Sequence, residues 1–327
     1  MGMDRTALVL GATGAAGQAV ARAFLERGWK VRALHRDPER ARQGREALAG
    51  VDWSRGDAMQ RAQVAGAAHG ADVIFHGVNP PGYRNWRELA PPMLQNTIAA
   101  AQESGARILF PGNIYNFGPD AWPLVHEDSP QHPKTRKGAI RVMLEECLRR
   151  AAGAGARSIV LRAGDFFGPG TGASWFGAAL VAPGKPVRAI RYPGDRQVGH
   201  AWAYVPDLAA TFADLAERER TLPDFERLHF GGHWLAPGVE IAESIRRVTG
   251  NPRLPIRSMP WPLLHVAAPF VPFVRELLEM RYLWREAVQL DNRKLVALLG
   301  REPHTPLDSA VRRTLEDLGC LQGAMMQ

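Results

Sequence analysis

Short apolar runs alternate with stretches of helical periodicity through the first half of the chain. The apolar runs predict strands at residues 6–10, 30–35, 51–53, 73–76, 108–110 and 158–162. Helices are predicted after the first strand and at residues 38–48, 86–104 and 139–152. Pro91 and Pro92 are expected to kink or interrupt the helix at 86–104 near its start. This alternation predicts an α/β fold, a doubly wound parallel sheet with helices on both faces.

The pattern becomes less regular after about residue 165. Residues 168–196 are rich in Gly and Pro, and residues 225–234 predict a late strand. Amphipathic helices are predicted at residues 239–249, 274–284, 292–299 and 307–318. We expect a first domain over residues 1–165 and a smaller, partly helical region over 166–327. Segments within about 198–235 are expected to return to the first domain.

The longest apolar stretch, residues 261–274, contains Pro262, Pro269 and Pro272. It is shorter than the roughly 18 uninterrupted apolar residues that a membrane-spanning helix needs. We interpret it as a buried lid or core segment. A contact with a membrane surface is the less favoured alternative.

The composition is that of a globular protein, and it argues against a nucleic-acid-binding protein, a disulfide-bonded protein, a metalloprotein and a serine hydrolase. The 327 residues are 46% hydrophobic and 23% charged. The net charge of +8 comes from dispersed arginines, which favours a small anionic ligand over nucleic acid. With two cysteines and no signal peptide, we expect a cytoplasmic protein without disulfides. The sequence shows no metal-ligand spacing, so no metal is expected, and no Gly-x-Ser-x-Gly nucleophile motif.

The junction between the first strand and the first helix carries the most specific signal. Gly11, Gly14 and Gly17 occupy the first, fourth and seventh positions after the strand. Glycines at this spacing let the backbone turn sharply and approach a diphosphate, which then faces free amides and the positive helix end. We therefore predict a dinucleotide site on the first domain. Its predicted contacts are Gly11, Thr13, Gly14, Ala15, Ala16 and Gly17.

The end of the second predicted strand favours NADP(H) over NAD(H). A carboxylate there would bind the adenosine ribose of NAD, but this chain has His35 followed by Arg36. An arginine can form charge-assisted hydrogen bonds with a 2′-phosphate. The alternative is that Arg36 is an ordinary surface residue. Asp57 and Ala58, after the third strand, are predicted to lie beside the adenine, unless they form only a turn.

Several motifs in succession resemble the extended or atypical branch of the short-chain dehydrogenase/reductase superfamily, whose members include epimerases and dehydratases. The matching segments are GATGAAG at 11–17, GDA at 56–58, FHGVN at 75–79, FPGN at 110–113, LRAGDFFGP at 161–169, YVPDLA at 204–209 and the stretch 290–306. The resemblance implies a Rossmann domain with an NAD(P) cofactor, and a homodimer. It also implies cofactor contacts at Gly77, Val78, Asn79, Gly164 and Phe166.

The resemblance breaks at the residues that carry the family's chemistry. The family uses a serine or threonine, a tyrosine, and a lysine four residues after the tyrosine. These positions fall on Asn113, Lys137 and Arg141. Arg141 can still bind ribose hydroxyls, and Asn113 can hydrogen-bond a substrate oxygen. Lys137 could polarise a carbonyl or donate a proton, or could simply lie on the surface.

Tyr115 is a candidate replacement for the missing acid. It follows Asn113 by two residues, near the expected nicotinamide end of the cofactor. The alternative is an aromatic side chain packed in a strand-ending turn. Tyr192, Tyr204 and His200 are weaker candidates, and His200 also fits the buried face of a strand.

Two functions are favoured from the sequence over a third, a purely structural scaffold, because the predicted diphosphate loop is intact. The favoured one is an NADP-dependent oxidoreductase or epimerase that acts on a carbonyl or hydroxyl group with non-standard catalytic residues. The alternative is an NADP-sensing or regulatory protein without turnover. The partner is expected to be a small molecule, hydrophobic or aromatic, because several tryptophans occur in the substrate-side sequence. Trp122, Trp175, Trp202 and Trp234 are predicted to line its pocket or to pack in the core.

Overall fold

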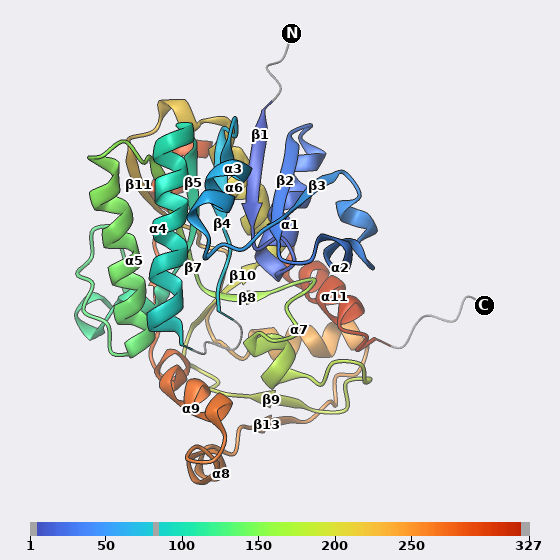
Figure 1. Cartoon of the computed structure of the whole chain (residues 1–327). Coiled ribbons are helices and arrows are strands. Elements are labelled where there is room, and N and C mark those ends of the chain that lie inside the picture. Colours follow the sequence, from blue (N-terminus) through green and yellow to red (C-terminus); the bar gives the residue numbers. More distant parts are fainter. Residues whose placement is uncertain (1–4, 81–84, 322–327) are drawn as a thin grey trace.

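The computed structural model describes residues 5–80 and 85–321. Seven parallel strands form its central sheet, as predicted (Figure 1). Their spatial order is β11 (Phe225–His229), β7 (Ser158–Ala163), β5 (Arg107–Asn113), β4 (Val73–His76), β1 (Thr6–Leu10), β2 (Lys30–His35) and β3 (Val51–Arg55). β1, β4 and β7 are buried along their whole length, because parallel strands covered on both faces need apolar side chains throughout.

Helices cover both faces of this sheet. One face carries α1 (Ala15–Glu26), α6 (Val205–Glu217) and α10 (Arg293–Leu299), whose buried side chains share one hydrophobic cluster with the strands. The other face carries α3 (Arg61–Ala68), α4 (Trp86–Ser104) and α5 (Arg136–Ala152), with a second cluster. From β1, the strands β2 and β3 extend the sheet in one direction, and the later strands β4, β5, β7 and β11 extend it in the opposite direction. The carboxyl ends of β1 and β4 are therefore the topological switch point, where doubly wound sheets bind ligands.

A third hydrophobic cluster fills the C-terminal half, below the sheet in Figure 1. Its short strands are β8 (Asp165–Phe167), β10 (His200–Tyr204) and β12 (His233–Leu235) in one sheet, β9 (Ile190–Tyr192) paired with β13 (Ile256–Ser258), and β6 (Leu124–Val125) paired with β14 (Gln289–Leu290). Its helices are α7 (Glu240–Thr249), α8 (Trp261–Ala267), α9 (Pro272–Glu279) and α11 (Leu307–Asp317).

Several predicted elements differ from the observed ones. The helix expected at 38–48 is α2 (Pro38–Arg42) followed by a 3-10 turn, Glu46–Leu48. α4 runs unbroken through Pro91 and Pro92. The late strand expected at 225–234 is two strands in different sheets, because the chain turns at Gly232 with φ +55°.

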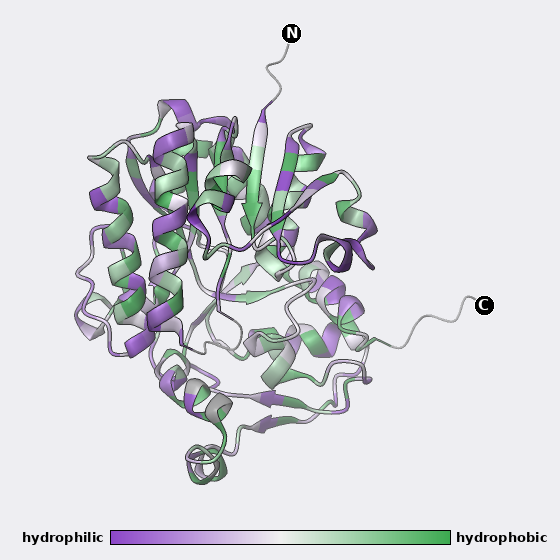
Figure 2. Ribbon diagram, viewed as in Figure 1, coloured by the Kyte–Doolittle hydropathy of each residue, from purple (hydrophilic) through white to green (hydrophobic). Residues whose placement is uncertain are grey.

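The interpretation of residues 261–274 as a buried lid or core segment holds for Trp261, Ala268 and Val274, which are buried, but not for the whole stretch. The side chains of Leu263, Val266 and Phe270 are 69%, 72% and 83% exposed. α8 projects at the lower tip of the molecule in Figure 1, and Figure 2 shows apolar positions along it. Within the described residues no helix is both long and apolar enough to cross a bilayer.

Candidate active site

Gly11 and Gly17 make the turn between β1 and α1 sterically feasible. Gly11 has φ +83°, and a Cβ there would lie 2.6 Å from the carbonyl carbon of Gly77 after β4. A Cβ at Gly17 would lie 2.1 Å from the carbonyl oxygen of Gly11. A side chain at either position would push α1 away from the switch point.

Gly14 has a different role, because the protein does not fill the space beside it. It caps the start of α1 with extended backbone, and a Cβ there would meet only the Gly11 carbonyl oxygen, at 3.5 Å. The first turn of α1 contains no acidic residue. Exposed amides and the positive helix end fit a diphosphate at this point. The loop residues predicted to bind the cofactor therefore lie together, Ala15 and Ala16 in the first turn and Thr13 beside Gly14.

Three exposed arginines gather at the ends of β2 and β3. Arg55 pairs in register with His35 and donates a hydrogen bond to the Arg36 carbonyl oxygen at 3.4 Å. Asp37 accepts from the Arg40 amide at 3.2 Å, so its carboxylate caps α2. The side chains of Arg36, Arg40 and Arg55 are all exposed, which gives this edge a positive character.

The residues expected beside the adenine form a turn after β3. Asp57 accepts a hydrogen bond from the Met59 amide at 3.0 Å, and the Ala58 carbonyl accepts one from Asn96 of α4 at 2.9 Å. These bonds fix the turn. Adenine contact at Asp57 and Ala58 stays a prediction.

A small cavity of about 30 Å³ lies between the ends of β4 and β5. Gly77, Val78, Asn79 and Arg141 all line it, so residues predicted separately for the cofactor are neighbours. Arg141 donates to the Pro111 carbonyl at 3.2 Å. These contacts place its guanidinium beside the predicted path of the cofactor.

His76 closes the inner side of this cavity and is uncharged. Its pKa is lowered to about 3, chiefly by burial and then by the charge of Arg141. Its Nδ1 lies 2.8 Å from the Thr97 hydroxyl. The positive charge in this cavity therefore comes from Arg141 alone among the residues that line it.

Gly164 and Phe166 flank the junction of β7 and β8. A Cβ at Gly164 would lie 2.3 Å from the Ala201 carbonyl of β10, so packing between strands accounts for glycine at this position. Phe166 is partly buried against the cluster that contains α1 and α6. Direct cofactor contact by either residue stays a prediction.

Asn113 and Gly138 hold the segment that carries Tyr115. The Asn113 Oδ1 accepts a hydrogen bond from the Tyr115 amide at 3.0 Å and starts a 3-10 turn, Ile114–Asn116. A Cβ at Gly138 would lie 2.2 Å from the Tyr115 carbonyl oxygen. The absence of a side chain at Gly138 lets the turn pack against α5, and Asn113 keeps its amide nitrogen as the remaining donor.

Lys137 is buried, so the surface alternative was wrong. Its side chain is 6% exposed, and its Nζ lies 4.0 Å from the Glu279 Oε2 of α9. The same carboxylate accepts a hydrogen bond from the Lys137 amide at 3.1 Å. Glu279 did not emerge from the sequence, because it lies 142 residues away and no local pattern links the two.

Tyr115 contacts a buried acid and histidine pair. Its hydroxyl lies 3.5 Å from the Asp165 Oδ1, and the Asp165 Oδ2 lies 2.9 Å from the His200 Nε2. The partly buried phenol of Tyr115 also packs against the third hydrophobic cluster, which fills the C-terminal half. Asp165 was seen in the sequence only as part of a motif, and His200 only as a weak candidate. β8 and β10 bring them together as neighbouring parallel strands.

Two aromatic side chains, Trp122 and Tyr282, line one side of the site that contains Tyr115 and Asp165, and we call them the aromatic wall. Trp122 and Tyr282 stack with ring centres 5.6 Å apart and an angle of 13° between the planes, and the Lys134 ammonium lies 5.4 Å from the centre of the Trp122 ring. The pKa of Tyr282 is raised, chiefly by burial and then by the charges of Asp165 and Glu279. Tyr282 therefore lies within electrostatic range of Asp165 and belongs to the same site. No pattern in the sequence indicated this residue.

The other aromatic candidates are mainly structural. Trp202 is fully buried and packs edge-on against Phe167, and Trp175 packs in the same cluster. Trp234 fills the space that a side chain at Gly199 would need. Tyr192 and Tyr204 are buried in the same cluster. Of the four tryptophans, Trp122 is the one that borders the Tyr115 region through its stacking on Tyr282.

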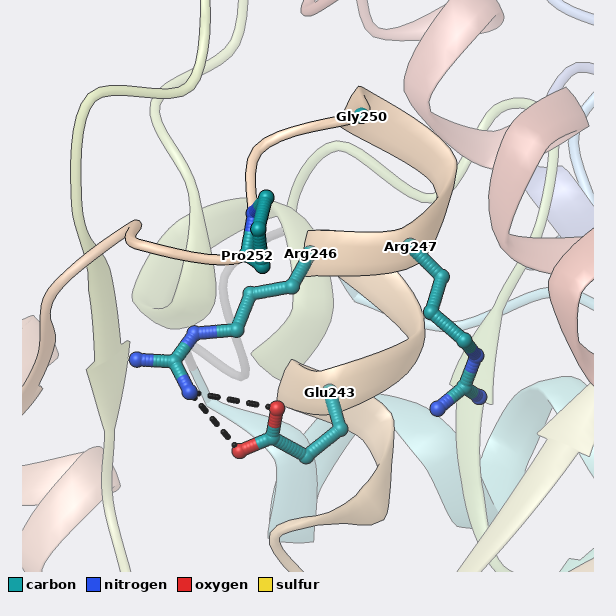
Figure 3. A pocket seen from close by; sticks show the side chains of 5 residues that line it. All are labelled: Glu243, Arg246, Arg247, Gly250 and Pro252. Atoms are coloured by element: carbon teal, nitrogen blue, oxygen red, sulfur yellow. Dashed lines mark hydrogen bonds and ion pairs between the residues drawn. The ribbon is translucent and has the colours of Figure 1, made fainter.

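A further hollow lies beside α7. It has a volume of about 290 Å³, and Figure 3 shows Glu243, Arg246 and Arg247 at its rim. Arg246 is bound to Glu243 at 3.0 Å, and Arg247 to Asp308 at 2.8 Å. These arginines are committed to ion pairs within the protein, so we do not place the active site here. Across residues 5–80 and 85–321, no three His, Cys, Asp or Glu side chains form a metal-binding group.

Comparisons with known proteins agree with this geometry. The sequence profile of the NAD dependent epimerase/dehydratase family matches residues 7–229. A 3-diazoavenalumate denitrifying reductase from Streptomyces sp is 27% identical over 270 residues, which are 77% of this chain and 84% of that protein.

Two solved structures illustrate the shared fold. A nucleoside-diphosphate-sugar epimerase from Pseudomonas aeruginosa gives a TM-score of 0.72 at 22% identity, covering 97% of this chain and 99% of that one. A variant of UDP-glucuronic acid 4-epimerase from Bacillus cereus, in complex with UDP-4-deoxy-4-fluoro-glucuronic acid and NAD, gives 0.74 at 15% identity, covering 96% and 98%.

Proposed function

This chain belongs to the NAD-dependent epimerase/dehydratase family, and from that premise we propose that it is an NADPH-dependent reductase of an aromatic small molecule. The position of Tyr115 carries the proposal. Its phenol is partly buried just after the carboxyl end of β5, and its hydroxyl lies beside the Asp165 carboxylate. A titratable O–H at this place can do the work that the family's tyrosine does from α5.

The arginines at the ends of β2 and β3 support NADPH over NADH. Arg36 is the first donor for the 2′-phosphate, and Arg40 and Arg55 add positive charge to the same exposed edge. Asp37, which lies between Arg36 and Arg40 in the sequence, has its carboxylate at the N-terminus of α2, where it accepts from the Arg40 amide. Charge-assisted hydrogen bonds from arginine suit a phosphate better than a ribose hydroxyl.

The bound cofactor would supply a hydride to an electrophilic atom of the substrate. Tyr115 supplies the matching proton: its O–H bond breaks, the proton moves to the substrate heteroatom, and the electron pair stays on the phenolate. Lys137, held by Glu279, sets a positive charge near the developing negative charge. The amide nitrogen of Asn113 is a further donor toward the substrate.

The aromatic wall and a relative support the substrate class and the direction of reaction. Trp122 and Tyr282 offer a stacking surface, and the Lys134 ammonium gives it a positive rim. The Streptomyces sp relative is named a reductase. A reductase therefore has more support here than an epimerase.

NADP sensing without turnover remains the second candidate, and one observation favours it. The family's tyrosine and lysine positions hold Lys137 and Arg141, and both have structural contacts, with Glu279 and with the Pro111 carbonyl respectively. A protein with this arrangement could bind NADP and signal its presence through a partner.

We also propose a homodimer that pairs through α4 and α5. These helices lie side by side on one face of the sheet in Figure 1, and both cover the same hydrophobic cluster. Light scattering of the native protein should give twice the chain mass.

The proposed activity is tested by following NADPH oxidation with a panel of aromatic aldehydes, ketones and diazo compounds. We expect turnover with at least one class, and a fall of about 10² in kcat for Tyr115→Phe with unchanged NADPH affinity. Tyr204→Phe is the matched control, because it removes the hydroxyl from a buried ring that packs against Phe167 in the core. NADPH binding without turnover for the whole panel would favour the sensing function.

A further inference from the structure

Asp165 and His200 form a buried pair that the proposed reaction has not yet used. Their side chains are 4% and 3% exposed, and Nε2 lies 2.9 Å from Oδ2. The imidazole stacks on Trp284, with ring centres 3.9 Å apart and 15° between the planes. Both side chains are therefore held in one geometry away from bulk water.

Hydrogen-bond partners fix the number of protons on this pair. The His200 Nδ1 lies 3.1 Å from the Leu283 carbonyl oxygen, which can only accept, so Nδ1 carries a proton. The contact between Nε2 and the Asp165 Oδ2 also needs a proton, since two lone pairs would otherwise face each other at 2.9 Å. Asp165 and His200 together thus hold two protons, one on Nδ1 and one between Nε2 and Oδ2. An ionised Asp165 beside a neutral His200 would hold only one.

The second carboxylate oxygen points to the proposed acid. The Asp165 Oδ1 lies 3.5 Å from the Tyr115 hydroxyl. A path of hydrogen-bonding atoms therefore leads from the phenol, through both oxygens of Asp165, to the His200 Nε2. Loss of the phenolic proton would place a phenolate beside Asp165, and the positive charge of a protonated His200 would compensate one of the two negative charges.

We propose that Asp165 and His200 are positioning residues that hold this proton and return it to Tyr115 after each turnover, an inference that rests on the proposed reductase function. Tyr115 gives its proton to the substrate heteroatom. The proton held at Nε2 then passes to the Asp165 carboxylate, and the carboxylic acid formed there gives a proton to the phenolate. The pair is left as a carboxylate and a neutral imidazole, and one proton from water restores it. No electrons move in these steps.

Other ionisable groups around the pair do not supply this proton. Tyr192 packs on Trp284, which His200 also contacts, and Tyr282 lies within electrostatic range of Asp165 and Glu279. Lys137 and Glu279 are bound to each other. Burial raises the pKa of both Tyr192 and Tyr282, so their phenols stay neutral and protonated.

Nitrogen NMR of the histidine side chains tests the protonation of the pair without any substrate. We expect the His200 Nδ1 in the native protein to be protonated across the neutral pH range, with a hydrogen-bonded proton shared between Nε2 and Asp165. His132, which pairs with Asp120 at the surface, provides the reference for an exposed pair. An unprotonated Nδ1, or the absence of a proton between Nε2 and Asp165, would overturn the proposal.

Kinetics test whether the proton serves Tyr115. Asp165→Asn keeps the shape and can donate its amide hydrogen to Nε2, but it cannot pass on a proton. We expect kcat to fall by about 10² with a changed pH profile, while NADPH affinity is retained. Asp120→Asn, in the exposed pair, should leave both unchanged, and His200→Gln should repeat the loss.

The outcomes of these experiments distinguish the proton relay from the reductase function on which it rests. A native protein that turns over, with an Asp165→Asn variant of equal kcat and the same pH profile, would refute the relay and leave the reductase intact. A native protein without turnover would refute the reductase, while the NMR result would still stand on the geometry of the pair.

Discussion

Glu145 and Arg162 form an ion pair 2.6 Å long next to the turn of the candidate active site, with side chains 3% and 0% exposed. Glu145 comes from α5 and Arg162 from β7, and the amide of Asn116 donates to the same carboxylate at 2.9 Å. Since Asn116 ends the turn that carries Tyr115, this buried pair supports the candidate acid.

Removal of Glu145 is predicted to destabilise the fold. Glu145→Leu would leave Arg162 buried without its counter-charge, which costs about 3–5 kcal/mol in comparable pairs. Urea unfolding should show this loss. Glu146→Leu is the matched control on the same helix, because Glu146 pairs with Arg149 at the surface and should change stability little. Equal losses for both variants would mean that the buried pair has no special role.

Two glycine variants should separate folding from cofactor binding. Gly17→Ala is predicted to destabilise the protein, because its Cβ would lie 2.1 Å from the Gly11 carbonyl oxygen. Gly14→Ala should fold, since its Cβ would meet only one protein atom, at 3.5 Å. That Cβ would instead enter the space proposed for the diphosphate, so NADPH affinity should fall at least about tenfold. Thermal unfolding and fluorescence titration measure the two effects; native affinity in Gly14→Ala would contradict the placement.

Arg36→Ala is predicted to lower NADPH affinity by about tenfold to hundredfold, the usual value of a charge-assisted hydrogen bond. NADH affinity should not change, because NADH lacks the 2′-phosphate. Arg61→Ala provides the control, as an exposed arginine paired with Glu103 on α4. If Arg36→Ala binds NADPH as tightly as the native protein does, and NADH likewise, the assignment of NADP is wrong.

The pH dependence of stability should reveal the buried His76. Burial lowers its pKa from 6.5 to about 3, so the unfolded chain binds a proton between these values and the folded chain does not. Its contribution to stability is complete above pH 6.5 and falls by about 1.4 kcal/mol for each pH unit below it, until about pH 3. His76→Gln should flatten the slope of unfolding free energy against pH over this range. An unchanged slope would show that His76 is not the responsible group.

The sequence predicted the features that depend on local patterns. Continuous apolar runs located the sheet strands, and the spacing of Gly11, Gly14 and Gly17 located the β1–α1 turn, because such features need only a few consecutive residues. The exposed α8 was missed for the opposite reason. Apolar composition suggested burial at Leu263 and Phe270, but the prolines divide the stretch into two short helices at the tip of the molecule.

The candidate site was only partly predictable, because its pairs are distant in the chain. Asp165 and His200 are 35 residues apart and meet through the pairing of β8 with β10. Lys137 and Glu279 are 142 residues apart. No periodicity or motif within either segment encodes such a meeting. Tyr115 could be named in advance only because it lies two residues from the end of β5, where the parallel fold places catalytic groups.

A structure with NADP+ bound tests the central claim most directly, since it needs no knowledge of the substrate. The account predicts that the diphosphate lies at Gly14, the 2′-phosphate contacts Arg36, and one face of the nicotinamide C4 is open with the Tyr115 hydroxyl in reach. A nicotinamide ring whose face is covered by protein, or a Tyr115 hydroxyl turned away from C4, would contradict a reductase that uses Tyr115 as its acid.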